Sequence, residues 1–420
     1  MDRPSPESLA RRARAAARVL APESRARKDA ALRAIADALV AEARPGSEAL
    51  AANAEDLAAA RAAGQDAAMV DRLALDEKRL VAIAAAVREI EHQADPVGES
   101  LGMQRRPNGL LIGRVRIPLG VLLMIYEARP NVTVDAAALA LKSGNAVLLR
   151  GGKEAKRSNE ALGNLVRRAI ASAGLPEDAV VIVPPGDREE IKELVALSGL
   201  IDLAIPRGGE GLIRFVKAHA KVPVIEHYKG VCHVYVDEGA DLDMAEHIVE
   251  NAKLSRVSVC NSMECLLVHE REAAAFLPRL ARLVASSGLE VRGDAATVRL
   301  LPQAKLATED DYGAEFLAKI MAARVVPSFD AALDHIARYG SNHTEAIVTR
   351  DYARANRFLR EVDASCVLVN ASTRFNDGGE LGLGAEMGIS TTKLHAYGPM
   401  GLEHLTTQKW VVQGDGQTRG

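Results

Sequence analysis

The stretch from Val121 to Ala155, "VLLMIYEARPNVTVDAAALALKSGNAVLLRGGKEA", decides the fold class of this chain. It holds two apolar runs, "VLLMIY" and "AVLLR", on either side of a helical pattern near residues 132–142, as in a strand–helix–strand unit. The alternation continues through "AVVIVP", "IDLAIP" and "VPVIE", with helical patterns near residues 153–173, 188–197 and 209–219. The sequence therefore predicts an α/β fold with a doubly wound parallel sheet of five strands, which binds ligands beyond the carboxyl ends of the strands.

Glycine-rich and charged segments follow these strands, at the edge where ligands are expected. Glycine turns that open a helix offer backbone N–H groups and a favourable dipole to an anion. A strict GxGxxG after the first strand is absent, so the glycines alone leave two readings open, a phosphate site or ordinary tight turns. The basic cluster of Arg150, Lys153, Lys156 and Arg157 would add positive charge for a phosphate. The segments are "EARPN" at 127–131, "RGGKEAKR" at 150–157, "PPGD" at 184–187 and "PRGGEG" at 206–211.

The flanking sequence predicts three further parts. Up to about Gln93 the chain is rich in strong helix formers, which indicates a helical layer. Residues 100–117 form two apolar-polar patterns around a Pro-Asn-Gly turn, so we expect a β-hairpin there. From Cys232 onward strand and helix patterns alternate again, as in "CHVYVDEGADLDMAEHIVENAKLSR" and "MECLLVH", which predicts a second α/β region.

Composition excludes several classes of function. A chain of 420 residues with 48% hydrophobic content is long enough for two or three subdomains with large cores. Because 53 basic and 56 acidic residues give a net charge of -3 and aromatics are only 3%, neither nucleic acid nor a membrane surface is an expected partner. No run approaches the roughly 18 to 20 apolar residues that span a bilayer.

The first residues and the cysteines indicate a cytoplasmic protein. "MDRPSPESLARRARAAARVL" is rich in Arg and Ala like a transit peptide, but Asp2 and Glu7 are acidic and the helical pattern continues beyond it. We therefore interpret this stretch as a folded helix. Four cysteines without a secretory signal are expected to be reduced thiols in the cytoplasm.

Two of the four cysteines, Cys260 and Cys265, lie in "VSVCNSMECLLVH", residues 257–269. Structural zinc sites favour cysteines on a short knuckle with a second pair elsewhere, and no second pair is present even when Cys232 and His233 are considered. If both thiols lay in one strand, their odd spacing would place them on opposite faces. The spacing therefore predicts no metal site.

The two thiols differ in their local sequence. Cys265 lies inside the apolar run "CLLV" and is predicted to be a core residue. Cys260 precedes that run and follows a helical pattern that holds Lys253 and Arg256, where positive charge and backbone N–H groups would favour a thiolate. Residue types alone leave Cys260 open between a nucleophile and an ordinary thiol.

Longer motifs resemble a known family over nearly the whole chain. They are "IYEARPNVTVDAAALALKSGNAVLLRGGKEA", "PRGGEGLI", "CHVYVDEGADLDMA", "NSMECLLVHE", "GSNHTEAIVT" and "NASTRFNDGGELGLGAEMGISTTKLHAYGPMGLE". Together they are similar to the glutamate-5-semialdehyde dehydrogenases, also called gamma-glutamyl phosphate reductases, of the aldehyde dehydrogenase superfamily. The resemblance implies an aldehyde dehydrogenase-like fold and NADPH-dependent reduction of L-glutamyl 5-phosphate to L-glutamate 5-semialdehyde and phosphate, the second step of proline biosynthesis from glutamate.

The resemblance also implies roles for single residues. The family's catalytic cysteine falls on Cys260, which would form a thioester, and the superfamily's oxyanion asparagine falls on Asn131. The lysine that holds the adenosine ribose in the superfamily becomes Arg150. The positive cluster from Arg150 to Arg157, which includes Lys153, favours the 2'-phosphate of NADPH. The other implied positions are Gly208 and Gly209 under the pyrophosphate, Glu315 near the nicotinamide ribose, and Arg256 and Arg374 for the anionic substrate.

Two segments depart from the family pattern. The family commonly reads "KTQRP" where this chain has "KLSRV" at residues 253–257, which weakens any role for those side chains although Arg256 is retained. The superfamily's "ELGGK" becomes the shorter "EHYKG" at residues 226–230, so Glu226 is a poor match for the glutamate that activates water. A reductase has no need of that base, because water would hydrolyse the thioester.

The resemblance implies a division of the chain into three functional parts. Residues 1–99 and 119–228 are expected to bind NADPH, residues 229–400 to carry catalysis, and residues 100–118 and 401–420 to form an oligomerisation hairpin and C-terminal strand. A homo-oligomer and a transient contact with glutamate 5-kinase are the expected partners. Two rival functions stay open, a hydrolytic or CoA-acylating aldehyde dehydrogenase and a non-catalytic binding partner.

Overall fold

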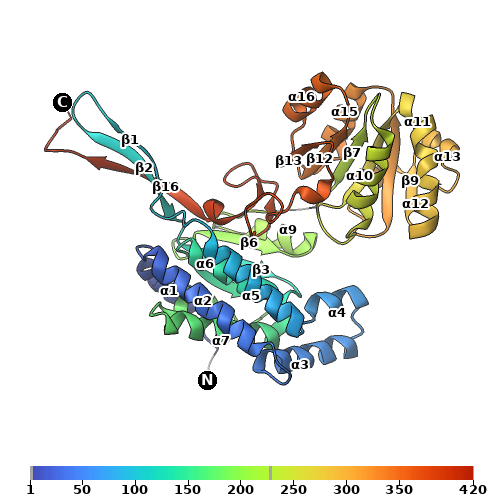
Figure 1. The fold of residues 1–420 in the computed structure, drawn as a ribbon. Coiled ribbons are helices and arrows are strands. Elements are labelled where there is room, and N and C mark those ends of the chain that lie inside the picture. Colours follow the sequence, from blue (N-terminus) through green and yellow to red (C-terminus); the bar gives the residue numbers. More distant parts are fainter. Residues whose placement is uncertain (1–2, 227–228, 420) are drawn as a thin grey trace. The chain divides into compact units, whose positions relative to one another are not determined.

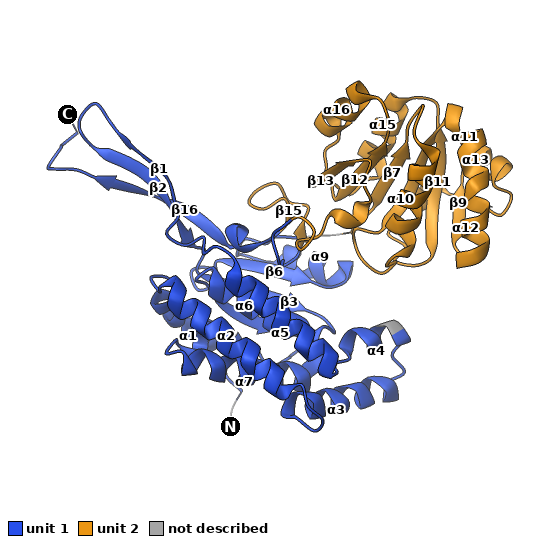
Figure 2. Cartoon of the chain, viewed as in Figure 1, with its two compact units in different colours: residues 1–226, 382–388, 400–420 blue, residues 227–381, 389–399 orange. Residues whose placement is uncertain are grey.

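The computed structural model describes residues 3–226 and 229–419 and divides the chain into two compact units (Figure 2). Unit 1 comprises residues 1–226, 382–388 and 400–420, and unit 2 comprises residues 227–381 and 389–399. Each unit holds a parallel sheet with helices against it, which confirms the predicted α/β class. In the described part of the chain no helix is long and apolar enough to cross a membrane.

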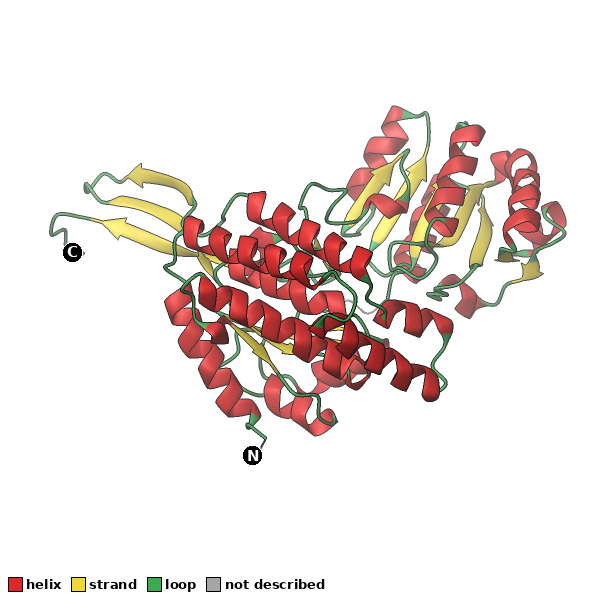
Figure 3. Cartoon of the chain, turned by 60° about the horizontal axis from the view of Figure 1, so that its bottom comes forward, coloured by secondary structure: helices red, strands yellow, loops and turns green. Residues whose placement is uncertain are grey.

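Five helices open unit 1 (Figures 1 and 3). Each begins directly after a Ser or Asp whose side-chain oxygen accepts a backbone N–H of the first turn, which is the usual N-cap arrangement. These caps explain where the long Ala-rich sequence breaks into separate helices. The helices are α1 (Pro6–Leu20), α2 (Arg25–Glu42), α3 (Glu48–Ala62), α4 (Ala67–Leu73) and α5 (Glu77–His92).

The sheet of unit 1 has four parallel strands in the order β5-β4-β3-β6, among the residues that the structure describes. The prediction of a fifth strand in "VPVIE" was wrong, because Val224 forms only an isolated bridge with Ala204. Pro223 has no N–H to extend the ladder. The strands are β3 (Val121–Tyr126), β4 (Ala146–Arg150), β5 (Val180–Ile182) and β6 (Leu203–Arg207), and the helices between them are α6 (Pro130–Lys142), α7 (Lys156–Ser172), α8 (Arg188–Val195) and α9 (Glu210–His219).

The predicted hairpin is confirmed, and the C-terminal strand joins it. Strand β1 (Ser100–Arg105) pairs antiparallel with β2 (Leu111–Pro118), which pairs in turn with β16 (Thr406–Gln413). The three strands extend away from the helical layer of unit 1 (Figure 1). The use of this sheet in oligomerisation stays a prediction.

Unit 2 is built on seven parallel strands in the order β10-β9-β11-β8-β7-β12-β13 in the described residues. The strands are β7 (Cys232–Val236), β8 (Met263–His269), β9 (Glu290–Gly293), β10 (Lys305–Leu306), β11 (Ile320–Val326), β12 (Thr344–Val348) and β13 (Cys366–Val369). The helices are α10 (Leu242–Leu254), α11 (Glu270–Phe276), α12 (Leu280–Ser287), α13 (Ala295–Leu300), α14 (Glu309–Tyr312), α15 (Phe329–Tyr339) and α16 (Tyr352–Glu361). Two short strands, β14 (Ile389–Ser390) and β15 (Gly398–Pro399), pair near the end of the chain.

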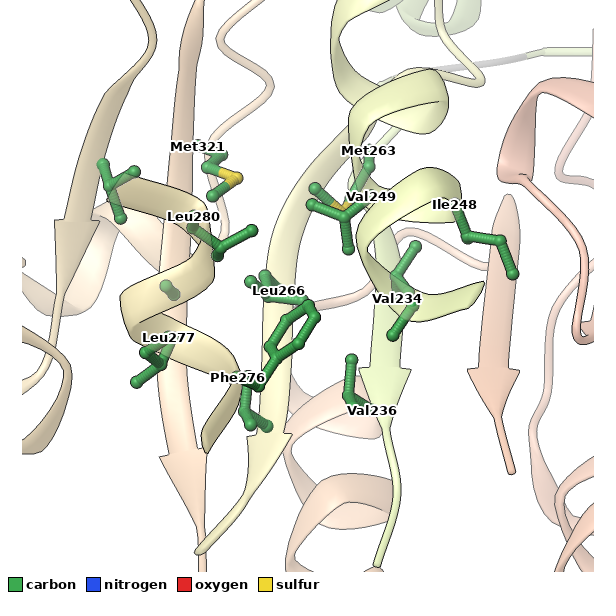
Figure 4. Close-up of a cluster of buried hydrophobic side chains, with 14 of the residues drawn as sticks. Val234, Val236, Ile248, Val249, Met263, Leu266, Phe276, Leu277, Leu280 and Met321 are labelled. Carbon is green, nitrogen blue, oxygen red and sulfur yellow. The ribbon is translucent and has the colours of Figure 1, made fainter. Parts of the chain in front are cut away.

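Side chains of this sheet alternate between two hydrophobic clusters. Val234 and Val236 of β7 join one cluster with Phe276 of α11 (Figure 4). Tyr235, between them in sequence, joins the opposite cluster with Cys265 of β8 and residues of α15 and α16. The period of two explains why β7 reads as a continuous apolar run, since both faces are covered.

The parts predicted for function and the compact units have different bounds, most of all at residues 382–388. Residues 382–388 were assigned to the catalytic part, but they pack within unit 1. There Gln93 Nε2 donates to the carbonyl of Leu383 at 2.9 Å, and Met387 N donates to the carbonyl of Met400 at 2.9 Å. These hydrogen bonds hold the segment against the end of α5 and against Met400, which follows β15.

Candidate active site

Cys260 lies in the loop that joins α10 to β8 in unit 2. A turn bond from Ser262 N to the carbonyl of Val259, 3.0 Å long, tightens this loop. The side chain of Cys260 is partly exposed, whereas Cys232 and Cys265 are fully buried. The prediction that Cys265 belongs to the core is confirmed, and Cys260 has the accessibility that a nucleophile requires.

The backbone of Cys260 is held from behind by the start of β7. A Cβ built on Gly230 would stand only 1.9 Å from the carbonyl oxygen of Cys260, so glycine is required for this close approach. The thiol of Cys232 donates to the same carbonyl at 3.1 Å. Burial raises the pKa of the Cys232 thiol well above its usual value, so this thiol keeps the proton that it donates. Glu315 Oε1 accepts from Gly230 N at 2.9 Å, which fixes the backbone of Gly230 in this contact with Cys260.

The next residue, Asn261, ties the cysteine loop to the segment after β13. Its amide Nδ2 donates to the carbonyls of Asn376, at 3.0 Å, and Arg374, at 3.4 Å. In return Thr373 Oγ1 donates to the carbonyl of Asn261 at 2.7 Å. Asn261 is only 3% exposed, so the bonds of Nδ2 replace water that this nitrogen has lost, while Oδ1 has no hydrogen-bond partner among the described residues. Cys260 and the residue that follows it are therefore both anchored to other segments of unit 2.

Two arginines lie close to the thiol. Burial lowers the pKa of Arg374, Asp377 opposes the shift, and the neighbouring charge of Arg256 lowers it further. The Arg374 guanidinium also interacts electrostatically with Cys260. Neither Arg256 nor Arg374 forms an ion pair with another residue that the structure describes. The pair thus offers positive charge for an anion beside the cysteine.

Lys253 does not supply such a charge. Its Nζ is fully buried and lies 2.5 Å from Oε2 of the buried Glu264, whose other oxygen accepts from Leu317 N at 3.2 Å. Burial lowers the pKa of Lys253 and raises that of Glu264 to about 7. Lys253 supports the helix below the loop, and the expectation that it favours the Cys260 thiolate was wrong. Helix α10 ends at Leu254, so Arg256 lies in the loop itself, not on the helix.

Asn131 lies in unit 1, at the start of α6 and directly after β3. Its Nδ2 donates to Asp135 Oδ2 at 2.9 Å, which leaves the second N–H of the amide for another acceptor. Burial raises the pKa of Asp135 to about 6, although the hydrogen bond from Asn131 opposes the shift. Asp135 therefore orients the amide of Asn131 along the first turn of the helix.

The predicted pyrophosphate turn lies between β6 and α9. Gly209 N donates to Glu127 Oε2 at 3.1 Å, and a Cβ built on Gly208 would stand 2.6 Å from the same carboxylate. A Cβ on Gly209 would meet nothing within 4 Å. An anionic oxygen thus already occupies the start of α9, which shows that this helix N-terminus accepts negative charge.

Arg150 and Lys153 follow β4, which is separated from β6 by β3 in the sheet order. Arg150 is only 9% exposed, its Nη2 donates to the carbonyl of Gly186 at 2.9 Å, and its Nε lies 3.9 Å from Glu190. Burial lowers the pKa of Arg150, and Glu190 opposes the shift. Lys153 is exposed at the start of a short 3-10 helix. Of the two residues, Lys153 is the one that presents its charge to solvent.

The two predicted glutamates have different surroundings. Glu226 Oε1 accepts from Lys217 Nζ at 2.7 Å within unit 1, and the two residues that follow it lie outside the described part of the chain. Glu315, expected near the nicotinamide ribose, contacts the backbone of Gly230 in unit 2. The structure therefore brings Glu315, Arg256 and Arg374 close to the Cys260 loop.

Sequence reasoning missed the residues that hold the cysteine loop. Gly230, Cys232 and Thr373 are far from Cys260 in sequence and carry no catalytic pattern of their own. Asn261 was the one residue whose sequence position could have indicated such contacts. A buried amide next to the predicted nucleophile must form hydrogen bonds with other segments.

The comparison with known proteins identifies the family. The model of the aldehyde dehydrogenase family matches residues 5–306. The gamma-glutamyl phosphate reductase of Sorangium cellulosum (strain So ce56) is 68% identical over 414 residues, which cover 98% of this chain and 97% of that protein. That of Desulfatibacillum aliphaticivorans is 57% identical over 411 residues, with 98% of each chain covered.

A solved structure agrees with these relatives. The crystal structure of gamma-glutamyl phosphate reductase from Thermotoga maritima is 44% identical, has a TM-score of 0.96, and covers 99% of this chain and 100% of its own. The predicted aldehyde dehydrogenase-like fold is thereby confirmed. The chain belongs to the aldehyde dehydrogenase family and, within it, to the gamma-glutamyl phosphate reductases, also called glutamate-5-semialdehyde dehydrogenases.

Proposed function

We propose that this protein reduces L-glutamyl 5-phosphate with NADPH to L-glutamate 5-semialdehyde and phosphate, through a thioester on Cys260. The reaction would be the second step of proline biosynthesis from glutamate. The names of the relatives support the reduction of glutamyl phosphate. The observation that carries the proposal is the Cys260 loop, which other segments hold at Cys260 and Asn261 and beside which two arginines have no ion-pair partner in the described chain.

In the first step the Cys260 thiolate attacks the acyl carbon of glutamyl phosphate. A carbon–sulfur bond forms, the carbon–oxygen bond to the phosphoryl group breaks, and inorganic phosphate leaves with the electron pair. The substrate carries a carboxylate and a phosphoryl group, so it requires positive charge near the reacting carbon. Arg256 and Arg374 are suited to this role because the structure leaves both guanidiniums without an ion-pair partner among the described residues.

In the second step the thioester is reduced. NADPH supplies a hydride to the acyl carbon, and the resulting thiohemiacetal loses the Cys260 thiolate to give the aldehyde. Negative charge develops on the acyl oxygen in both steps and requires N–H donors. The free N–H of Asn131 and the backbone N–H of Cys260 are the proposed donors. The proposal for Asn131 rests on the family resemblance and on the amide orientation that Asp135 imposes.

The residues of unit 1 fit a dinucleotide phosphate. The N-terminus of α9 holds the carboxylate of Glu127, so a pyrophosphate would compete with that carboxylate for the N–H of Gly209. Lys153 is exposed and is the proposed partner of the 2'-phosphate of NADPH. Arg150 is proposed beside the adenosine ribose, although its guanidinium already donates to the carbonyl of Gly186. Glu315 is proposed near the nicotinamide ribose.

The remaining roles follow from this reaction. We propose that residues 1–99 and 119–228 bind the cofactor and residues 229–400 carry the chemistry. The sheet of residues 100–118 and 401–420 would join copies of the chain, since Trp410 is 62% and Val412 55% exposed on it. A cytoplasmic location and a transient contact with glutamate 5-kinase follow from the place of the reaction in biosynthesis.

The test is the reverse reaction, NADP reduction by glutamate 5-semialdehyde, measured with and without inorganic phosphate. We expect turnover that requires phosphate, because phosphate must attack the thioester to release the acyl group. Turnover without phosphate that yields glutamate would show that water reaches the thioester and that the protein is a hydrolytic aldehyde dehydrogenase. Turnover that requires coenzyme A would instead show a CoA-acylating enzyme, and no turnover in folded protein would favour a binding role.

A further inference from the structure

A second cluster of reactive side chains lies inside unit 2, apart from the Cys260 loop. One ligand atom from each of His233, Cys265 and His335 lies within 4.8 Å of the other two. His233 comes from β7, Cys265 from β8 and His335 from α15, and exposure is 0%, 0% and 5%. Sequence spacing gave no sign of this cluster, because His335 is 70 residues from Cys265.

The spacing of these atoms suits a tetrahedral zinc ion. Zinc binds thiolate sulfur at about 2.3 Å and imidazole nitrogen at about 2.0–2.1 Å, which places sulfur and nitrogen ligands about 3.6 Å apart. Cys265 Sγ and His335 Nε2 are 3.5 Å apart. All three ligand atoms lie within 4.8 Å of one another, so the third, from His233, is within reach of the same ion.

His233 is prepared as a ligand by its other ring nitrogen. Its Nδ1 lies 2.8 Å from Oε2 of Glu345, which is 1% exposed. Burial lowers the pKa of His233, but the charge of Glu345 raises it overall to about 10, so a metal ion must displace the proton of Nε2. The ring then keeps its other proton on Nδ1, toward Glu345, as in the carboxylate–histidine–metal arrangement of many zinc sites. The buried Nε2 atom has no hydrogen-bond partner among the residues that the structure describes. Such an unpaired buried polar atom is costly unless it binds something.

The charges and the access path also suit a divalent cation. A Cys265 thiolate and the Glu345 carboxylate together carry two negative charges in the interior, which one zinc ion balances. His335 also lines a surface pocket of about 330 Å³, together with Arg324, Arg338 and Tyr339, so an ion can reach the cluster from that side.

Arg324 is the group that opposes metal binding. Its Nη1 lies 3.5 Å from His335 Nδ1, and a guanidinium can only donate. Ligation through Nε2 places the ring proton on Nδ1, so Arg324 must withdraw. In the same conformation its guanidinium stands 5.2 Å from the ring centre of Tyr312, a contact that can hold the side chain when it leaves His335.

We propose that His233, Cys265 and His335 form a buried zinc site in unit 2, with Glu345 fixing the orientation of His233. The site is independent of the proposed reaction at Cys260. Its role would be to cross-link β7, β8 and α15, since a bound ion stabilises only the folded chain.

The test measures metal content and a spectroscopic signature. The full-length protein is loaded with zinc, passed through a desalting column and analysed for zinc per chain. We expect about one zinc per chain in the wild type and in Cys366→Ser, and loss of it in Cys265→Ser. Glu345→Gln should weaken zinc binding about 10- to 100-fold, whereas Arg324→Gln should strengthen it, since the amide oxygen accepts from His335 Nδ1–H.

Cobalt substitution covers the case in which Cys265→Ser does not fold. Cobalt in the wild-type protein should give the thiolate charge-transfer absorption of a tetrahedral cysteine site, and this absorption should persist in Cys260→Ser. If Cys260→Ser lost zinc and cobalt and Cys265→Ser kept them, the metal would be bound by the accessible Cys260 thiol, and the proposal would be overturned. Wild-type protein that retains no zinc and shows no thiolate–cobalt absorption overturns it as well.

Discussion

Gly230→Ala tests whether the loop that carries Cys260 must keep its position. An alanine Cβ at this site would stand 1.9 Å from the carbonyl oxygen of Cys260 and 2.9 Å from its Cα. Contacts of a real Cβ are essentially never shorter than 3.0 Å, so the two segments must separate by about 1.1 Å. Both colliding groups belong to the main chain, and therefore no rotation of a side chain can relieve the contact.

The expected cost falls mainly on turnover. A displacement of about 1 Å at a reacting atom is enough to lower the rate about 100-fold. The strain and the altered bonds to the Cys260 carbonyl should reduce the free energy of unfolding by about 1–3 kcal/mol. We therefore expect kcat for phosphate-dependent NADP reduction to fall about 100-fold in a variant that is still folded.

The assay compares Gly230→Ala with Gly313→Ala, measuring kcat and urea unfolding for both. A Cβ on Gly313 would have its nearest neighbour, in the ring of Tyr339, at 3.9 Å, which is an ordinary contact. Gly313→Ala should thus behave like the wild type. If Gly230→Ala also kept the wild-type kcat, the reasoning that the backbone behind Cys260 positions the nucleophile would be refuted.

Three further predictions concern single charges. Asp135→Asn should raise the free energy of unfolding at pH 8 by about 1–3 kcal/mol. The pKa of Asp135 is raised to about 6, so the native wild-type protein loses stability as the pH rises from about 4 to 6, and asparagine avoids this loss. Denaturant titrations at pH 4 and pH 8 should show the gain only at pH 8. Lys153→Ala should raise KM for NADPH about tenfold and leave KM for NADH unchanged. Lys78→Ala is the control, because Lys78 is an exposed lysine in the first turn of α5. Lys253→Met should lower the free energy of unfolding by about 3–5 kcal/mol because it leaves Glu264 buried and unpaired, and adding Glu264→Leu should restore most of the loss.

The fold was predictable because its signals are local. Alternating apolar runs and helical patterns located β3, β4 and β6, and the Pro-Asn-Gly turn located the hairpin. The error at "VPVIE" arose because an apolar run becomes a strand only when a neighbour pairs along its length, and Pro223 interrupts the pairing. Strand pairing is a property of the whole sheet, which a single run does not reveal.

The site was predictable only in part, for a related reason. The loop position of Cys260 and the core position of Cys265 were predictable from the apolar run "CLLV", because Cys265 lies inside this run and Cys260 precedes it. The contacts of Gly230 and Thr373 with the loop depend on segments that meet only in the folded sheet. Charge was the least predictable property, since Lys253 looked available in sequence but is neutralised by Glu264 in the structure.

The measurement that tests the central claim most directly is the isolation of the acyl-enzyme. The protein is mixed with glutamate 5-semialdehyde and NADP in the absence of phosphate, and its peptides are analysed by mass spectrometry. The proposed mechanism predicts a glutamyl thioester on Cys260, which disappears when inorganic phosphate is added and does not form in Cys260→Ala. NADP reduction under these conditions that leaves neither an adduct nor free glutamate, or an adduct on Cys366, would contradict a thioester on Cys260.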